Sequence, residues 1–161
     1  MADVHTKEVR SYNMSQIRSK NTKPELVVRK YLFAKGFRYR LHSKYLPGKP
    51  DIVLPKYRTV IFVHGCFWHG HEGCKYFVVP KTKIEWCLNK IAKNQQLDKE
   101  HIKKLRSDKW NVITLFECKL KKANIDSTLD TIEESLWYWT QSVVRFYIWS
   151  TFRIKCLYSL K

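Results

Sequence analysis

Apolar residues in the first half of the chain recur in a pattern that predicts one helix followed by three short strands. The segment TKPE at 22–25 fits a capping box with proline in the first turn, and Gly36 is a suitable end, so one helix is expected between them. FRYRLH at 37–42 alternates as a strand does, and the apolar runs at 51–54 and 59–63 indicate two short buried strands.

The second half of the chain predicts a long helix, a strand and a further helix. The helix is expected from about Lys83 to Arg106, the strand over 110–116 and the last helix over 127–139. The stripe of the long helix expected to face inward is Ile84, Leu88, Ile91, Gln95, Asp98, Ile102 and Leu105. The resulting order, α-β-β-β-α-β-α, indicates an α/β protein with a mixed sheet and helices on its faces.

The chain divides by composition into three parts. Residues 1–21 are polar and basic and suit an arm or a short helix, and residues 22–136 form the expected core. Residues 137–161 are rich in aromatic side chains and suit either a covering strand or helix or a poorly ordered end.

Positive charge is unevenly distributed along the chain. The formal net charge is +17, and Lys and Arg outnumber Asp and Glu by 12 to 3 in residues 1–50 and by 12 to 5 in residues 81–122. Residues 51–80 carry 3 against 2 and are nearly neutral. A cleft with basic walls and a neutral floor attracts a polyanion, so nucleic acid is the expected partner.

Nothing in the sequence indicates export or membrane insertion. The polar opening MADVHTKEVR lacks the apolar segment of a signal peptide, and no apolar run approaches the roughly 20 residues of a membrane span. We therefore expect a cytoplasmic protein, in which the five cysteines are free thiols or metal ligands rather than disulfides.

Cysteine and histidine crowd into the irregular stretch at 64–79. The preferred tetrahedral zinc set is Cys66, His71, Cys74 and Cys118, which would fasten this loop to the end of the last core strand. The alternative is buried free thiols with surface histidines. A full set of four ligands activates no water, so the zinc is expected to be structural. Cys87 and Cys156 have no such neighbours and are expected to be free.

Pro50-Asp51 ends a turn and opens a strand, and the next strand ends at His64. This is the layout of a PD-(D/E)xK nuclease core, in which an aspartate binds a divalent metal beside the scissile phosphate. The usual E-x-K is replaced by Phe62-Val63-His64, so a backbone carbonyl and His64 would have to substitute. Asp98 on the inward face of the long helix implies a buried partner; the alternative is a helix rotated outward near its middle.

The chain resembles the Very Short Patch repair (Vsr) DNA mismatch endonucleases. The resemblance covers roughly residues 1–120 and rests on NMSQIRSKNT, LPGKPDIVLPKYRTVIFVHGCFWHGHEGC, KIAKN, Asp98 and FEC, of which HGCFWHGH-x-x-C is the most specific. It implies a restriction-endonuclease-like fold with a structural zinc. It also implies a magnesium-dependent nick on the 5′ side of the thymine in T·G mismatches, which arise when 5-methylcytosine deaminates.

The resemblance also implies roles for individual residues. Asp51 and the Val63 carbonyl would bind magnesium, His69 would act as the general base with Asp98 as its partner, and His64 would assist at the phosphate. Glu25 would support the site, although its place in the capping box is an adequate structural explanation. The family further suggests a monomer and a link to the MutL repair protein.

Recognition of the mismatch would depend on aromatic side chains and on the basic arm. Phe67 and Trp68 resemble the family's intercalating pair, and the arm with Met14, Arg18 and Lys20 would lie along the minor groove. Where the family has Phe-Trp this chain has Trp86-Cys87. Trp86 would therefore replace the family's third ring from one position earlier, a rotation of roughly 100° on a helix.

Two other functions are compatible with the same residues. One is a restriction-type or junction-cutting nuclease on the same core, which would also cut matched DNA. The other is a zinc-stabilised DNA-binding protein that does not cleave.

Overall fold

The computed structural model describes residues 6–16, 20–79 and 83–139. Its elements follow the expected order, with one additional helix in the basic arm. They are α1 (Lys7–Ser15), α2 (Lys23–Ala34), β1 (Arg40–Leu41), β2 (Ile52–Leu54), β3 (Thr59–His64), α3 (Ile84–Ser107), β4 (Asn111–Phe116) and a helix at 125–139. Two short 3-10 turns, Pro55–Tyr57 and Glu117–Leu120, follow β2 and β4.

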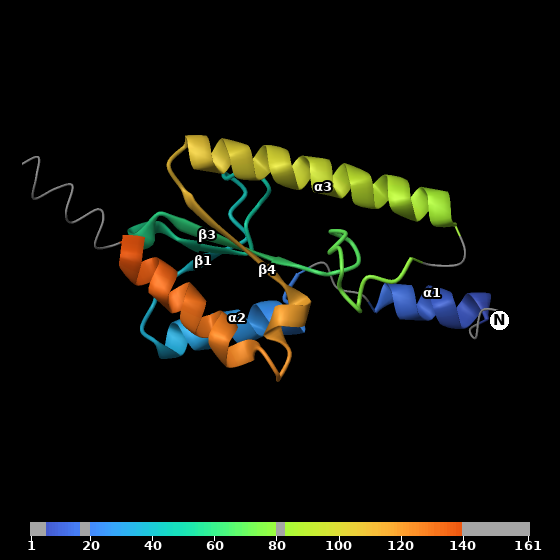
Figure 1. Cartoon of the computed structure of the whole chain (residues 1–161), viewed down its shortest axis with the longest axis horizontal. Helices are drawn as coiled ribbons and strands as arrows, with labels where there is room; N and C mark the ends of the chain where they lie inside the picture. Colours follow the sequence, from blue (N-terminus) through green and yellow to red (C-terminus); the bar gives the residue numbers. More distant parts are fainter. Residues whose placement is uncertain (1–5, 17–19, 80–82, 140–161) are drawn as a thin grey trace, which may run out of the picture.

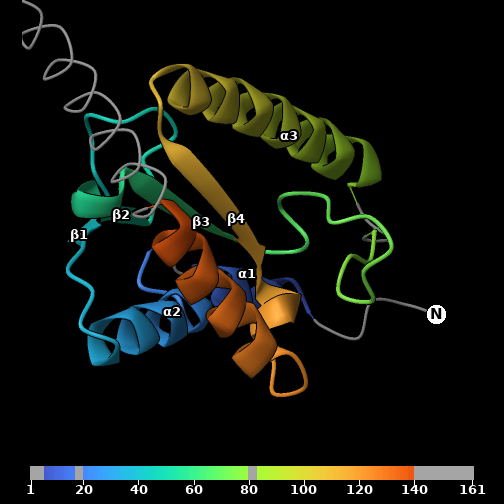
Figure 2. The ribbon, with the colours of Figure 1, turned by 60° about the vertical axis from the view of Figure 1, so that its left-hand side comes forward.

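The four strands form one mixed sheet in the order β1-β2-β3-β4. β2 is antiparallel to both β1 and β3, whereas β3 and β4 are parallel and are joined through α3. Figures 1 and 2 show α3 on one face of this sheet and α2 with the helix at 125–139 on the other. The predicted mixed α/β architecture is confirmed.

Alternation along the strands gives the sheet an apolar surface on each face. Ile61 joins the larger core cluster with α2 and the helix at 125–139, including Val28, Leu32, Ile132 and Leu136. Its neighbours Val60 and Phe62 point to the other face and pack with Leu105 of α3. Because β3 is buried on both faces, its continuous apolar run is explained by its place inside the sheet.

The predicted ends of α2 are confirmed in detail. The backbone N–H of Thr22 donates to Glu25 Oε1 at 3.2 Å, as a capping box requires. Gly36 has a φ of +84°, and the N–H of Phe37 donates to the carbonyl of Leu32 at 2.9 Å, which is a Schellman ending. Both ends of the helix that carries Glu25 are therefore fixed by local sequence.

Two sequence expectations need correction. Of the strand expected at 37–42, only Arg40–Leu41 pairs. The inward face predicted for α3 was wrong at the start of the helix, where Ile84 and Leu88 are 46% and 42% exposed and Cys87 is buried instead. The first turns of α3 extend past the end of the sheet, over the loop after β3, so fewer side chains there are covered (Figure 1).

The aromatic tail lies largely outside the described residues. Residues 137–139 continue the last helix, and Trp137 packs edge-on against Phe37 with ring centroids 6.3 Å apart. Residues 140–161, including Cys156, are outside the described part. Within the described residues, no helix is both long and apolar enough to cross a membrane.

Candidate nuclease site

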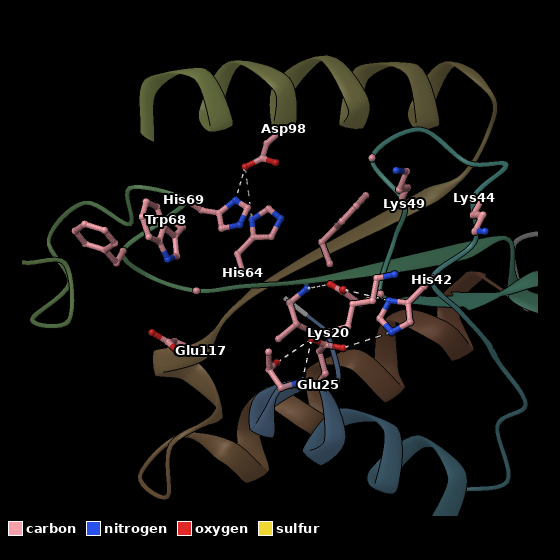
Figure 3. Close-up of a pocket in the computed structure, with 17 residues that line it drawn as sticks. Lys20, Glu25, His42, Lys44, Lys49, His64, Trp68, His69, Asp98 and Glu117 are labelled. Atoms are coloured by element: carbon pink, nitrogen blue, oxygen red, sulfur yellow. Dashed lines mark hydrogen bonds and ion pairs between the residues drawn. The ribbon is translucent and has the colours of Figure 1, made fainter. Parts of the chain in front are cut away.

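A pocket of about 840 Å³ opens between α3 and α2, beside the end of β3. Figure 3 shows Asp98 of α3 and the two histidines His64 and His69 on one side of it, and Glu25 of α2 on the other. Three lysines contribute to its lining: Lys20, Lys44 and Lys49. The pocket thus combines carboxylates and histidines with three lysines.

Asp51 lies immediately before β2, where the antiparallel pairing brings it next to the end of β3. Its Oδ2 accepts a hydrogen bond from the backbone N–H of Val63 at 2.8 Å. Burial raises the pKa of Asp51, and nearby Glu25 adds to this, while the Val63 N–H acts in the opposite direction. A carboxylate held in this way favours a positively charged ligand that would restore its ionised form.

Glu25 is buried, at 2% exposure, and its carboxylate accepts several hydrogen bonds within its own segment. The donors include the N–H groups of Asn21 and Thr22 and the guanidinium of Arg29, whose Nη2 lies 2.5 Å from Oε2. The position of Glu25 is therefore compatible with both roles considered for it, because it caps α2 and also lines the pocket beside Asp51.

His42 is a pocket residue that the sequence analysis missed. Its ring lies between the two carboxylates, with Nδ1 3.9 Å from Asp51 Oδ1 and Nε2 3.9 Å from Glu25 Oε2. Glu25, His42 and Asp51 each offer a ligand atom, and these atoms lie within 4.8 Å of one another. The position of His42 at the end of the strand expected at 37–42 was the only local signal.

The second cluster joins the loop after β3 to the middle of α3. The rings of His64 and His69 are stacked, with centroids 3.7 Å apart and an angle of 8° between them. Asp98 Oδ2 lies 2.6 Å from His69 Nδ1 and 3.9 Å from His64 Nδ1. The prediction that Asp98 faces inward toward a histidine is confirmed.

Burial and close packing shift the pKa values of His64 and Asp98 in this cluster. Burial, with the nearby His69, lowers the pKa of His64 to about 4, so this ring is neutral near pH 7. Burial acts to raise the pKa of Asp98, but the hydrogen bond to His69 and the neighbouring His64 lower it overall. An ionised Asp98 beside His69 is the arrangement that supports a general base.

The four predicted zinc ligands come together at one point. Cys66, His71, Cys74 and Cys118 offer ligand atoms that lie within 4.8 Å of one another, and His71 Nδ1 is 3.4 Å from Cys118 Sγ. Burial raises the pKa of Cys66 to about 12, while the backbone of Tyr76 lowers that of Cys74. Three sulfurs and one imidazole nitrogen match the donor set of structural zinc sites.

Side chains of α3 hold the loop that carries these histidines. Asn94 Nδ2 donates to the carbonyl of Trp68 at 2.9 Å, and Gln95 Nε2 donates to that of Gly70 at 3.2 Å. Gly70 has a φ of +56°, and a Cβ there would lie 2.4 Å from Gln95 Nε2. The polar face of α3 thus binds the backbone of the loop, which explains Gln95 beside Asp98.

The aromatic residues of the loop are half-buried and lie close to the start of α3. The rings of Phe67 and Trp68 meet edge-on with centroids 4.8 Å apart. The ammonium of Lys90 lies 4.6 Å from the Trp68 ring and 5.0 Å from the ring of Trp86, which is 57% exposed. Trp86 is therefore grouped with Trp68 around one cation, whereas Cys87 is buried.

For most of the remaining predicted site residues the structure gives a position but few contacts. Lys20 lines the pocket, Met14 lies on α1, and Arg18 is outside the described residues. Val63 is next to Asp51 through its N–H; the role expected for its carbonyl stays a prediction.

Comparison with known proteins identifies the family. The family model for the DNA mismatch endonuclease Vsr matches residues 2–75. A Type II nicking enzyme of Neisseria meningitidis serogroup A is 48% identical over 125 residues, which cover 78% of this chain and 89% of that protein. The DNA mismatch endonuclease Vsr of Escherichia coli K12 is 41% identical over 137 residues, covering 83% and 87%.

Among solved structures, the catalytic domain of a homing endonuclease superposes with a TM-score of 0.49 and 19% identity, covering 74% of this chain and 98% of that one. The chain is a mixed α/β protein with a pocket lined by carboxylates, histidines and three lysines. On the sequence relationships, the chain belongs to the Vsr family of DNA mismatch endonucleases.

Proposed function

We propose that this protein is a magnesium-dependent endonuclease that nicks one strand of duplex DNA on the 5′ side of the thymine in a T·G mismatch. Membership of the Vsr family supports the reaction class. The observation that carries the proposal is the pocket itself, where Asp51 and the His69–Asp98 pair line one space with three lysines around them.

Magnesium is a suitable ion for the Asp51 side of this pocket. Asp51 Oδ1 makes no hydrogen bond to any residue that the structure describes, and burial disfavours its charge unless a cation is near. Asp51 and the Val63 carbonyl would hold the ion, with Glu25 beside them. A divalent ion there stabilises charge developing on the phosphate and lowers the pKa of bound water.

The protein's own groups supply the proton transfer and the placement of the phosphate. His69 accepts a proton from the attacking water through Nε2, because its Nδ1 is held by Asp98 at 2.6 Å. Asp98 stabilises the imidazolium that results. His64, neutral and stacked on His69, keeps the second ring in place and can donate to the phosphate. Lys20, Lys44 and Lys49 attract and position the DNA backbone.

The cysteine and histidine cluster would hold a structural zinc ion, which fixes the loop that carries His69. Phe67, Trp68 and Trp86 are the proposed wedge at the mismatch. A mispaired step costs less to open than a paired one, and wedging aromatic rings exploit that difference. The shared contact of Trp68 and Trp86 with the Lys90 ammonium supports Trp86 as the third ring despite its shifted position.

Three end-labelled duplexes that differ only in a T·G, C·G or A·T pair at one position test this proposal. In magnesium, we expect a nick in the thymine strand of the T·G duplex alone. Cleavage of both strands of the matched duplexes would favour a restriction-type nuclease. Binding to all three without any nick would favour a DNA-binding protein that does not cleave.

A further inference from the structure

We propose that His42, held by Arg29, is a positioning residue that orients Asp51 for the metal ion and is not itself a metal ligand. This inference rests on the proposed metal site at Asp51. It concerns the cluster of Glu25, His42 and Asp51. By distance alone, this cluster could be a metal site with one nitrogen and two oxygen ligands.

Arg29 fixes one side of the His42 ring. It is a buried residue of α2, and its Nη2 lies 2.5 Å from Glu25 Oε2 and 3.1 Å from His42 Nε2 (Figure 3 shows His42 beside Glu25). Its Nη1 donates to Asn21 Oδ1 at 2.6 Å. The guanidinium is thus anchored by a carboxylate and an amide, and one of its N–H groups is directed at the imidazole.

The direction of that contact determines which nitrogen of His42 carries the proton. A guanidinium has only donors, so Nε2 of His42 must be the acceptor. The ring proton then lies on Nδ1, the nitrogen that faces Asp51 Oδ1 at 3.9 Å. A protonated Nδ1 has no lone pair for a metal, and Nε2 is already occupied by Arg29. The imidazole therefore presents an N–H dipole to the carboxylate.

The backbone holds His42 in this place. Its φ is +46°, in the left-handed region, and its backbone N lies 3.4 Å from the carbonyl oxygen of Asp51, where β1 ends and β2 begins. His42 and Asp51 are therefore opposite one another across the strand pair. The Val63 N–H holds Oδ2 by a hydrogen bond, and the His42 ring lies 3.9 Å from Oδ1, too far for a hydrogen bond but close enough for an electrostatic contact that favours one orientation of the carboxylate. Groups that orient a ligating carboxylate commonly change metal affinity by about 10- to 100-fold.

The backbone also supplies a matched pair of variants. Asparagine and glycine both tolerate a φ of +46°, so neither His42→Asn nor His42→Gly strains the chain. Asparagine keeps an amide N–H at the position of Nδ1, whereas glycine removes the side chain. We measure Mn²⁺ binding to the full-length protein without DNA, from the electron paramagnetic resonance signal of free Mn²⁺, with Asp51→Asn defining the site.

We expect His42→Gly to weaken Mn²⁺ binding at the Asp51-dependent site about tenfold, and His42→Asn to stay within about threefold of the parent protein. The proton position is read directly from the ¹⁵N spectrum of the imidazole nitrogens, assigned by the signal that disappears in His42→Asn. We expect a protonated Nδ1 and an unprotonated Nε2.

Three results would overturn the inference. An imidazole protonated on Nε2 would contradict the contact with Arg29, and equal losses in His42→Asn and His42→Gly would make the ring itself the ligand. Unchanged binding in His42→Gly would likewise remove its positioning role. Failure of the metal site is a separate outcome: Mn²⁺ binding that Asp51→Asn does not alter would refute that part of the proposed function, while the proton position at His42 would stand.

Discussion

Substitution of Asp98 by asparagine removes one charge from the pocket and almost nothing else. The carboxylate of Asp98 is a quarter exposed and lies 2.6 Å from His69 Nδ1, which is the shortest polar contact of the histidine loop with α3. Asparagine has the same shape, and its carbonyl oxygen can still accept from His69. What it lacks is the negative charge that, in the proposed mechanism, stabilises a protonated His69 during proton transfer.

The size of the effect follows from this one contact. A hydrogen bond to a charged partner contributes up to about 3 kcal/mol, and each 1.4 kcal/mol of barrier corresponds to about a tenfold change in rate. That figure corresponds to about 100-fold and is the upper value, since the pair is only partly buried, so we expect the nicking rate of Asp98→Asn to fall about 10- to 100-fold.

Single-turnover nicking of a T·G duplex with excess protein is the suitable assay, because it isolates the chemical step from product release. Glu100→Gln is the control, since Glu100 is an exposed carboxylate on the same helix. The affinity for uncut DNA, measured in Ca²⁺, is expected to change less than about threefold in both variants, as Asp98 supplies no positive charge to the duplex.

The reasoning would be refuted if Asp98→Asn nicked within about threefold of the parent protein while remaining folded. His69 would then not need an ionised partner, and the proposed general base would have to be sought elsewhere in the pocket. A parallel fall in Glu100→Gln would show that the effect belongs to the charge of α3 as a whole.

Three further predictions concern the loop and its aromatic neighbours. Gly70→Ala should destabilise the protein by about 2–3 kcal/mol in urea unfolding, because it combines a left-handed backbone with displacement of the Gln95 hydrogen bond. Gly73→Ala is the control, since its φ is +68° with nothing within 4 Å of the added Cβ, and only about 1 kcal/mol should be lost. Equal losses of unfolding free energy in Gly70→Ala and Gly73→Ala would show that the contact of Gly70 with α3 does not contribute to stability. Cys66→Ser should lower both bound zinc per chain, measured by atomic absorption, and the melting temperature, whereas Cys87→Ser should leave the zinc content unchanged; a Cys66→Ser protein with full zinc would exclude this ligand set. Trp86→Ala should weaken binding to a T·G duplex about tenfold and binding to a matched duplex little, as a stacked ring contributes about 1–3 kcal/mol; equal weakening of both would limit Trp86 to general DNA contact.

The sequence was informative wherever a residue type has a strong local or chemical preference. The capping box and Gly36 located α2, and the spacing of Cys66, His71, Cys74 and Cys118 identified a cluster that the structure brings together. Asp98 was found because a carboxylate on an apolar helix face requires a partner.

The sequence could not reveal what depends on contacts between distant segments. His42 follows a two-residue strand and belongs to no motif; it becomes part of the site only because Arg29 and Asp51 meet it from α2 and β2. The prediction that Ile84 and Leu88 of α3 are buried was wrong for a related reason. Periodicity shows which face of the helix is apolar, but not how far the sheet beneath that face extends.

Asp51→Asn offers the most direct test of the central claim, which is that a metal ion held at Asp51 drives the nick. The parent protein and the variant are compared in single turnover on a T·G duplex in Mg²⁺, with zinc content and duplex affinity measured on the same preparations. We expect nicking to fall at least about 100-fold, with zinc and affinity retained. An Asp51→Asn protein that nicks the T·G duplex as fast as the parent would contradict the account.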